Sequence, residues 1–300
     1  MPTVRLAPNP VYPDRLRAEV ERYLERLRFS DEPASAGLEE AMRYSLLAGG
    51  KRIRPVLALA TAEAIGREPA SVLPLAAALE LIHTYSLIHD DLPAMDDDDL
   101  RRGRPTCHRA FGEDVAILAG DGLYAEAFRL LLTEQPGEPE DLLAAAAELA
   151  AATGVQGMVG GQYVDVAATA APGPDGLRRL HELKTGRLIA GSIECVLLLS
   201  GAHKRDTISL FRTFASELGV LFQIVDDILD VTGSQETLGK QQGSDERLGK
   251  RTYVTEFGLD GARSLANESH QRARAALAGA APTGAPELEQ ITDFIATRTY

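Results

Sequence analysis

The sequence predicts an all-α protein, folded as one large helical bundle of ten or more helices. Apolar residues recur mostly at intervals of three and four residues, which is the period of an α-helix. Runs of strict alternation between apolar and polar residues, which indicate strands, are missing. No internal repeat of fixed period is evident, so a single bundle is favoured over a solenoid.

The helices are predicted in order from this periodicity and from the loops between them. Segments that combine proline and glycine mark loops at 135–139, 171–176 and 281–284. Ala-rich and Leu-rich periodic stretches predict the first four helices at 13–27, 38–48, 53–65 and 72–89. The later helices are expected at 111–132, 141–154, 157–168, 175–184, 186–199, 208–233, 253–279 and 286–297. No composition break demands a boundary, so residues 1–300 are expected to form one domain.

Composition and charge exclude several classes of protein. The chain is 45% apolar and 25% charged, which are globular values, so wholesale disorder is excluded. A net charge of −13 argues against a nucleic-acid partner, because such binding requires clustered Lys and Arg. Two cysteines, Cys107 and Cys195, are too few for a disulfide framework and indicate a reducing, cytoplasmic location. Glu80 and His83 interrupt the most apolar stretch, so no stable membrane insertion is expected.

Two acidic clusters stand out, each near the C-terminal part of an apolar helix. The first spans residues 90–99 (DDLPAMDDDD) and the second spans residues 226–230 (DDILD). Carboxylates at this end oppose the helix dipole and repel one another. Such clusters therefore cost stability unless a cation lies beside them.

The spacing within each cluster brings oxygen ligands together. Asp226 and Asp230 are four residues apart and share one helical face. Asp90 and Asp96 can approach only if the helix kinks or ends, which Pro93 favours. Hard oxygen ligands grouped in this way suit Mg²⁺ whose coordination is completed by phosphate oxygens.

Two alternatives apply to the first cluster. Residues 96–99 could be a solvated charge run at a helix end, but the same pair-plus-one pattern recurs in the apolar stretch 221–231, which weighs against a bland surface. A calcium loop is discarded, because the alternating acidic ligands, the central glycine and the terminal Glu of that motif are missing.

Basic residues accompany these clusters. Residues 49–55 (GGKRIRP) place three cations beside flexible backbone, but Lys51 is followed by Arg instead of Ser or Thr, so this is not a Walker loop. Arg101 and Arg102 follow the first acidic cluster, and two lysines follow the second, at positions 240 and 250. Each cation alone fits a solubilising surface role. Their ordered repetition after acidic clusters favours binding of diphosphate oxygens.

These motifs together resemble those of the short-chain trans-prenyl diphosphate synthases, closest to the bacterial farnesyl diphosphate synthases. The matches cover about two thirds of the chain, from GGKRIRP at 49–55 through the two Asp-rich motifs to Lys250, with Gly160-Gly161-Gln162 and Lys184-Thr185-Gly186 between them. A lone acidic motif would fit a terpene cyclase equally well. The resemblance implies helices around a central cavity, Mg²⁺ as cofactor and a homodimer.

The resemblance also implies a role for each matching residue. Asp90, Asp96 and Asp226 would bind Mg²⁺ that bridges the allylic diphosphate, supported by Asp91, Asp227 and Asp230. The allylic diphosphate would be held by Arg101, Lys184, Lys240 and Lys250. Isopentenyl diphosphate would be held by Gly50, Lys51, Arg54, His83 and Arg102. Thr185 and Gln223 would lie near the reacting carbons. Gln162 and Asp165 match a family helix and would support the site without contacting the substrate.

The resemblance also implies the reaction, whose chemistry explains why these residue types occur. Diphosphate leaves an allylic carbon, and the double bond of isopentenyl diphosphate attacks the resulting cation. A proton is then lost, completing a head-to-tail condensation. Metal and basic side chains stabilise the charge on oxygen, and an apolar pocket protects the cation from water. The expected substrates are isopentenyl, dimethylallyl and geranyl diphosphates.

Product length depends on the helix before Asp90. Helical geometry places Ser86 on the same face as Asp90 and turns Tyr85 aside, so geometry alone does not name the residue that stops the chain. The resemblance implies that an aromatic residue at Tyr85, with the insertion Pro93-Ala94, accompanies a fifteen-carbon product. Tyr85 could instead simply pack in the core. Geranylgeranyl synthesis, a terpene cyclase and a non-catalytic acidic scaffold are the alternative functions.

Overall fold

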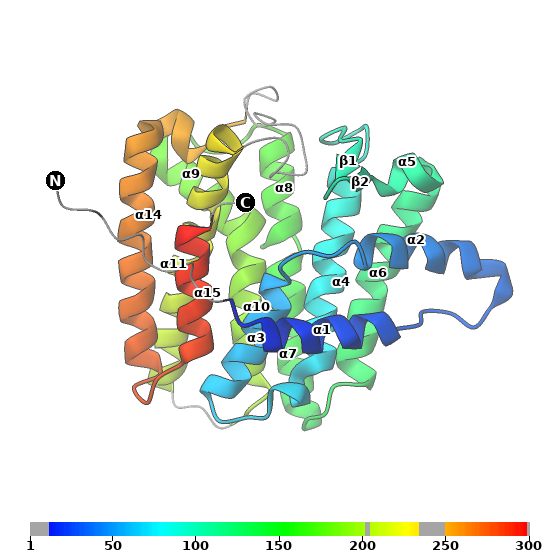
Figure 1. Cartoon of the computed structure of the whole chain (residues 1–300), viewed down its shortest axis with the longest axis horizontal. Coiled ribbons are helices and arrows are strands. Elements are labelled where there is room, and N and C mark those ends of the chain that lie inside the picture. The colour runs from blue at the N-terminus through cyan, green and yellow to red at the C-terminus, as the bar shows by residue number, and fades with distance from the viewer. Residues whose placement is uncertain (1–11, 202–204, 234–249, 299–300) are drawn as a thin grey trace.

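Helices make up nearly all of the secondary structure in the computed structural model, which describes residues 12–201, 205–233 and 250–298. More than ten α-helices occur in these ranges, which confirms the all-α prediction (Figure 1). Their bounds are α1 Asp14–Arg26, α2 Ala36–Leu46, α3 Ile53–Ala64, α4 Leu73–Asp90, α5 Cys107–Phe111, α6 Glu113–Thr133, α7 Pro139–Thr153, α8 Met158–Val166, α9 Gly173–His181, α10 Arg187–Leu198, α11 Arg205–Thr232, α14 Tyr253–Ala280 and α15 Pro286–Thr297. Within the described residues the strands are β1 (Leu100–Arg101) and β2 (Arg104–Pro105), a short antiparallel hairpin.

Helix α4 lies in the middle of the bundle. It packs against α3, α6 and α10, and residues such as Leu75, Leu79 and Ile82 are fully buried. A helix that is apolar on all sides is buried on all sides. The core built around it is continuous, from Tyr12 before α1 to Ile295 in α15.

The two acidic clusters lie at the same end of the bundle. Figure 1 shows the C-terminal ends of α4 and α11 near the top, beside the β1–β2 hairpin and the last turns of α8. Asp90 is the last residue of α4, and Asp226 to Asp230 lie in the last two turns of α11. The predicted placement of both clusters at C-terminal helix ends is therefore confirmed.

Some predicted helix boundaries were wrong. The helix predicted at 111–132 begins two residues later, as α6, and the short helix α5 before Gly112 was not predicted. The break predicted at Thr185 is absent, because a π-helical turn, Glu182–Gly186, joins α9 to α10 without interruption. Single π-helical turns inside longer helices are frequently found at functional sites.

Three helical segments are long and apolar enough to cross a membrane, judged by length and composition: Pro69–Asp90, Pro139–Val166 and Thr207–Thr232. The first segment contains Glu80, but a single charged residue does not make a helix polar, so the expectation drawn from uninterrupted apolar runs was too strict. In the first and third segments, 67% and 56% of the most apolar window is buried inside the fold. The second is 33% buried, so an apolar face of α7 and α8 lies outside the core.

Candidate active site

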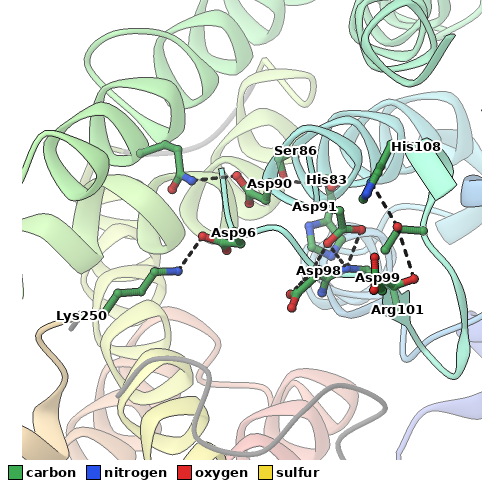
Figure 2. Close-up of polar contacts among 12 residues, drawn as sticks. His83, Ser86, Asp90, Asp91, Asp96, Asp98, Asp99, Arg101, His108 and Lys250 are labelled. Carbon is green, nitrogen blue, oxygen red and sulfur yellow. Dashed lines mark hydrogen bonds and ion pairs between the residues drawn. The ribbon is translucent and has the colours of Figure 1, made fainter. Parts of the chain in front are cut away.

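The first acidic cluster folds back on the end of α4. The backbone N–H of Asp96 donates to the carbonyl of Asp90 at 2.8 Å, so the chain turns sharply there, as the spacing required. Gln162 from α8 donates its amide to Asp90 Oδ1 at 2.8 Å. Lys250 reaches Asp96 Oδ1 at 2.9 Å from the other side (Figure 2). Two carboxylates and two partners from distant segments therefore converge on this turn.

Asp91 belongs to a different group of contacts. Its carboxylate accepts from Arg101 Nε at 2.8 Å and from Arg101 Nη2 at 2.5 Å, and only 3% of the residue is exposed. Asp98 lies 3.6 Å from the same guanidinium. Figure 2 shows this group on one side of the helix end, with Asp90 and Asp96 on the other. The structure thus pairs two side chains that the sequence assigned separately to metal and to diphosphate.

The Asp90 carboxyl has an unusual proton affinity. Burial raises its pKa to about 6, and although Lys184 lowers the pKa, the charge of Asp96 raises it further. The ionised form is disfavoured because the lost hydration is not fully replaced by positive charge. A cation beside Asp90 would therefore stabilise the carboxylate.

The second acidic cluster is held by contacts from α11 itself, from the start of α14 and from the residue after α15. Asp226 accepts from Arg298, which follows α15, and Asp227 Oδ1 accepts from Gln223 Nε2 at 2.8 Å. The backbone N–H of Tyr253, at the start of α14, donates to Asp227 Oδ2 at 2.7 Å. Asp230 is buried, with 5% of its surface exposed.

A π-helical turn, Glu182–Gly186, lies against both α8 and α11. Lys184 Nζ donates to Asp165 of α8 at 2.5 Å, and Thr185 Oγ1 donates to Gln223 of α11 at 2.9 Å. The approach to α8 requires glycine at position 161, because a Cβ there would lie 2.3 Å from the Lys184 backbone nitrogen. Lys184 and Thr185 are thereby fixed between α8, whose Gln162 contacts Asp90, and α11, which carries the second cluster.

The basic loop of residues 49–54 follows α2 and runs into the first two residues of α3. The Arg102 guanidinium covers Gly50, where a Cβ would come within 2.7 Å of it, and its Nη1 donates to the carbonyl of Gly49. Lys51, Arg54 and Arg102 make no ion pair with any described residue. Burial lowers the pKa of Arg54 to about 10, although the charges of Glu80 and Asp226 raise it. Three cations without carboxylate partners form a site suited to an anion.

His83 lies among these arginines. Burial holds its pKa well below the usual value, and the charges of Arg54 and Arg102 lower it further. The imidazole is therefore neutral at physiological pH. A neutral ring here can donate a hydrogen bond to an anion without adding to the repulsion among the guanidinium groups.

The two chain-length candidates have different surroundings. The Tyr85 ring contacts His89 and Tyr124, with centroids 5.0 and 5.1 Å apart in edge-to-face geometry. Ser86 donates its hydroxyl to the carbonyl of His83 at 2.9 Å, within the same helix. Tyr85 is therefore part of an aromatic cluster shared by α4 and α6.

Within the described ranges, no three Asp, Glu, His or Cys side chains are already gathered as ligands around one point. Asp90, Asp96 and Asp226 instead contact Gln162, Lys250 and Arg298 respectively. Lys240 lies outside the described residues. The motifs did not reveal Arg298, because it is a single arginine near the end of the chain without a neighbouring pattern.

Comparison with known proteins identifies the family. The polyprenyl synthetase family model matches residues 35–293, and the chain therefore belongs to this family. The farnesyl diphosphate synthase of Geobacillus stearothermophilus is 45% identical over 284 residues, which cover 94% of this chain and 93% of that protein. The chloroplastic geranylgeranyl pyrophosphate synthase 9 of Arabidopsis thaliana is 45% identical over 267 residues, covering 87% and 74% respectively.

The fold is also similar to solved structures. A geranyltransferase from Helicobacter pylori, complexed with magnesium and isoprenyl diphosphate, has a TM-score of 0.82 at 32% identity, over 97% of each chain. The resemblance inferred from the motifs is confirmed, and family membership supports trans-prenyl synthase activity. Farnesyl and geranylgeranyl synthases both occur among the relatives, so they do not select one product.

Proposed function

We propose that this protein is a Mg²⁺-dependent prenyltransferase that joins isopentenyl diphosphate head to tail with dimethylallyl and then geranyl diphosphate, giving farnesyl diphosphate. The observation that carries the proposal is the pairing of two kinds of site at one end of the bundle. Lys51, Arg54 and Arg102 have no carboxylate partners among the described residues, and the carboxylates of two helix ends lie nearby. A terpene cyclase has no second diphosphate for such cations to bind.

The residues at the acidic ends suit a divalent cation. Asp90, Asp96 and Asp226 provide hard oxygen donors, and the raised pKa of Asp90 reflects a carboxylate short of positive charge. We propose that these residues hold Mg²⁺, with Asp91, Asp227 and Asp230 in support. Once bound, the metal supplies positive charge for the departure of diphosphate from the allylic carbon.

The protein's own side chains would then bind and orient the two substrates. Lys184 and Lys250, now paired with Asp165 and Asp96, would turn to the allylic diphosphate. For Lys240 the same role rests on the sequence alone, and Arg101 would act at that diphosphate from its ion pair with Asp91. Gly50, Lys51, Arg54, His83 and Arg102 would receive isopentenyl diphosphate.

Thr185 and Gln223 would stabilise the allylic cation. Thr185 donates its only hydroxyl proton to Gln223, so the remaining lone pairs of its oxygen are oriented as acceptors. Gln223 is fixed in turn by donating to Asp227. Oxygen dipoles fixed before the reaction stabilise developing positive charge without reorganisation. The alkene of isopentenyl diphosphate attacks this cation, a carbon–carbon bond forms, and the departing diphosphate takes the proton.

Further parts of the proposal concern product, assembly and location. The aromatic cluster at Tyr85 supports a fifteen-carbon product, with geranylgeranyl diphosphate as the alternative. Most of the exposed large apolar side chains in the described residues, including Leu118, Leu143 and Tyr163, lie on α6, α7 and α8. We propose that this face pairs with a second copy in a homodimer. We also propose one domain over residues 1–300, a cytoplasmic location and no stable membrane insertion.

One assay tests the activity. Labelled isopentenyl diphosphate is incubated with and without an allylic diphosphate, with Mg²⁺ present or removed by chelation, and products are extracted and separated by chromatography. Label in a fifteen-carbon product only when both diphosphates and Mg²⁺ are present is the expected result. A twenty-carbon product would assign geranylgeranyl synthesis, conversion of a single diphosphate would assign a cyclase, and no turnover would contradict an enzyme. Light scattering after gel filtration tests the dimer.

A further inference from the structure

The central arginine of the basic loop does not face the anion site. Arg52 is buried, with none of its side chain exposed, and its Nη1 lies 2.7 Å from Glu80 Oε1 on α4. Its Nε lies 2.9 Å from Glu21 Oε1 on α1, and its Nη2 donates to the carbonyl of Leu46 at 2.8 Å. Arg52 thus ties the loop to three helices.

The backbone of Arg52 is strained. Its φ of 54° and ψ of 41° are left-handed, a conformation that arginine seldom adopts and that persists only where surrounding contacts determine it. Arg52 is also the residue directly before α3, so this conformation sets the direction in which the loop enters that helix. The side-chain contacts of Arg52 therefore hold the loop that carries Lys51 and Arg54.

Glu80 is the buried anchor of this arrangement. It is 1% exposed, and Arg52 is its only ion-pair partner among the described residues. Glu21 is less confined, because 30% of its side chain is exposed. A buried carboxylate that holds one arginine directs it strongly, since any other position would leave two charges unpaired.

We propose that Glu80 is a positioning residue for isopentenyl diphosphate: through Arg52 it holds residues 49–54 in the conformation that presents Lys51 and Arg54 to the diphosphate. This inference rests on the proposed function, because it concerns the same anion site. It assigns Glu80 no contact with substrate. It separates the arginines of the loop into one structural residue, Arg52, and one binding residue, Arg54.

Charge and geometry make opposite predictions for Glu80→Gln. The variant removes a negative charge near Arg54 and Arg102, so simple electrostatics predicts tighter binding of an anion. If Glu80 instead positions the loop, the variant leaves Arg52 with a weakened partner, the strained turn relaxes, and binding weakens. The sign of the change therefore distinguishes the two roles.

The experiment measures binding without turnover. Isothermal titration calorimetry with isopentenyl diphosphate alone gives Kd for the wild type, Glu80→Gln and Glu80→Asp. Glu80→Asp keeps the charge but shortens the side chain, so it tests geometry even if Glu80→Gln fails to fold. We expect Kd to rise about tenfold or more for Gln and several-fold for Asp. An unchanged or lower Kd in the folded variants would overturn the inference.

A matched control and a kinetic readout complete the test. Glu194→Gln changes another buried glutamate, whose Oε2 lies 3.0 Å from Arg212 Nε, and should leave Kd unchanged. In steady-state assays Glu80→Gln should raise KM for isopentenyl diphosphate by the factor seen in Kd, and leave KM for the allylic substrate within about twofold. A wild type that does not bind isopentenyl diphosphate contradicts the proposed function itself. A binding wild type with an unaffected Glu80→Gln contradicts only the positioning role.

Discussion

Gln162 on α8 donates its side-chain amide to Asp90 Oδ1, 2.8 Å away at the last residue of α4. The contact fixes one oxygen of a carboxylate whose burial raises its pKa to about 6. Gln162 Oε1 is itself buried, with no hydrogen-bond partner among the described residues. The amide nitrogen therefore stays at Asp90 although the amide oxygen has no partner among the described residues. We infer that Gln162 supports the acidic cluster by orienting Asp90.

This contact predicts a change in metal requirement. Gln162→Leu should raise the Mg²⁺ concentration needed for half-maximal activity by about 10- to 100-fold, as loss of partners that orient metal ligands commonly does. The measurement is a Mg²⁺ titration of activity at saturating substrates. Gln135→Leu serves as the control, because Gln135 is a buried glutamine that accepts from the backbone N–H of Leu75, at the start of α4. A Mg²⁺ requirement that is the same in both variants would contradict the supporting role.

The acidic clusters themselves predict loss of turnover without loss of fold. Asp90→Ala and Asp226→Ala should each lower kcat by about 10²-fold or more, because each removes an oxygen donor from the proposed metal site. Removal of one carboxylate from a group of like charges should not unfold the protein. Activity and thermal melting are measured together. Asp99→Ala is the control, since Asp99 is exposed and pairs with Arg109 on the surface; full activity in either test variant would remove the metal assignment.

The sequence predicted one turn of the chain at the candidate site, but not the contacts of the side chains around it. The spacing of Asp90 and Asp96 required a chain turn, and the structure has one. The pairing of Asp91 with Arg101 was not predictable, because Arg101 lies ten positions later, in strand β1, and either side chain could equally well face the site. The same holds for Arg52, which in sequence is one of three equivalent cations and in space is directed inward by Glu80.

The helical period predicted the fold well but not its interruptions. Apolar residues that recur at intervals of three and four indicate a helix, and α4 and α11 could therefore be predicted from the sequence. A π-helical turn keeps the chain helical while shifting its register, so Glu182–Gly186 looks like a break in the apolar pattern although the helix continues. The close approach of Gly161 to Lys184 is likewise invisible in sequence, because it depends on how two helices meet.

The aromatic cluster on α4 and α6 predicts control of product length. Tyr85→Ala removes a ring that lies 5.1 Å from Tyr124, and the space it leaves should admit a longer product. We expect a shift from fifteen-carbon toward twenty-carbon or longer products, measured by chromatography of the extracted products. Phe257→Ala is the control, because Phe257 is an exposed aromatic residue on α14. If the product distribution of Tyr85→Ala equals that of the wild type, Tyr85 does not limit the chain.

A buried histidine predicts acid sensitivity of the fold. His181 is 8% exposed, and burial lowers its pKa to about 4, with the charge of Asp165 acting in the opposite direction. The unfolded chain, with a histidine pKa near 6.5, therefore binds more protons than the native state between these values. This contribution to stability is complete above about pH 6.5 and is lost as pH falls toward 4. It amounts to about 3 kcal/mol in the free energy of unfolding.

Replacement of this ring tests that contribution. In His181→Phe the free energy of unfolding should fall by about 2 to 3 kcal/mol less than in the wild type between pH 7.5 and 4. Part of the fall in the free energy of unfolding toward low pH should remain, because burial also holds the pKa of His83 well below the usual value. Urea denaturation at both pH values gives the difference. His270→Phe is the control, since His270 is 28% exposed beside Asp293 and its replacement leaves His181 in place. If the free energy of unfolding of His181→Phe falls as much as that of the wild type between pH 7.5 and 4, His181 is not the group that titrates.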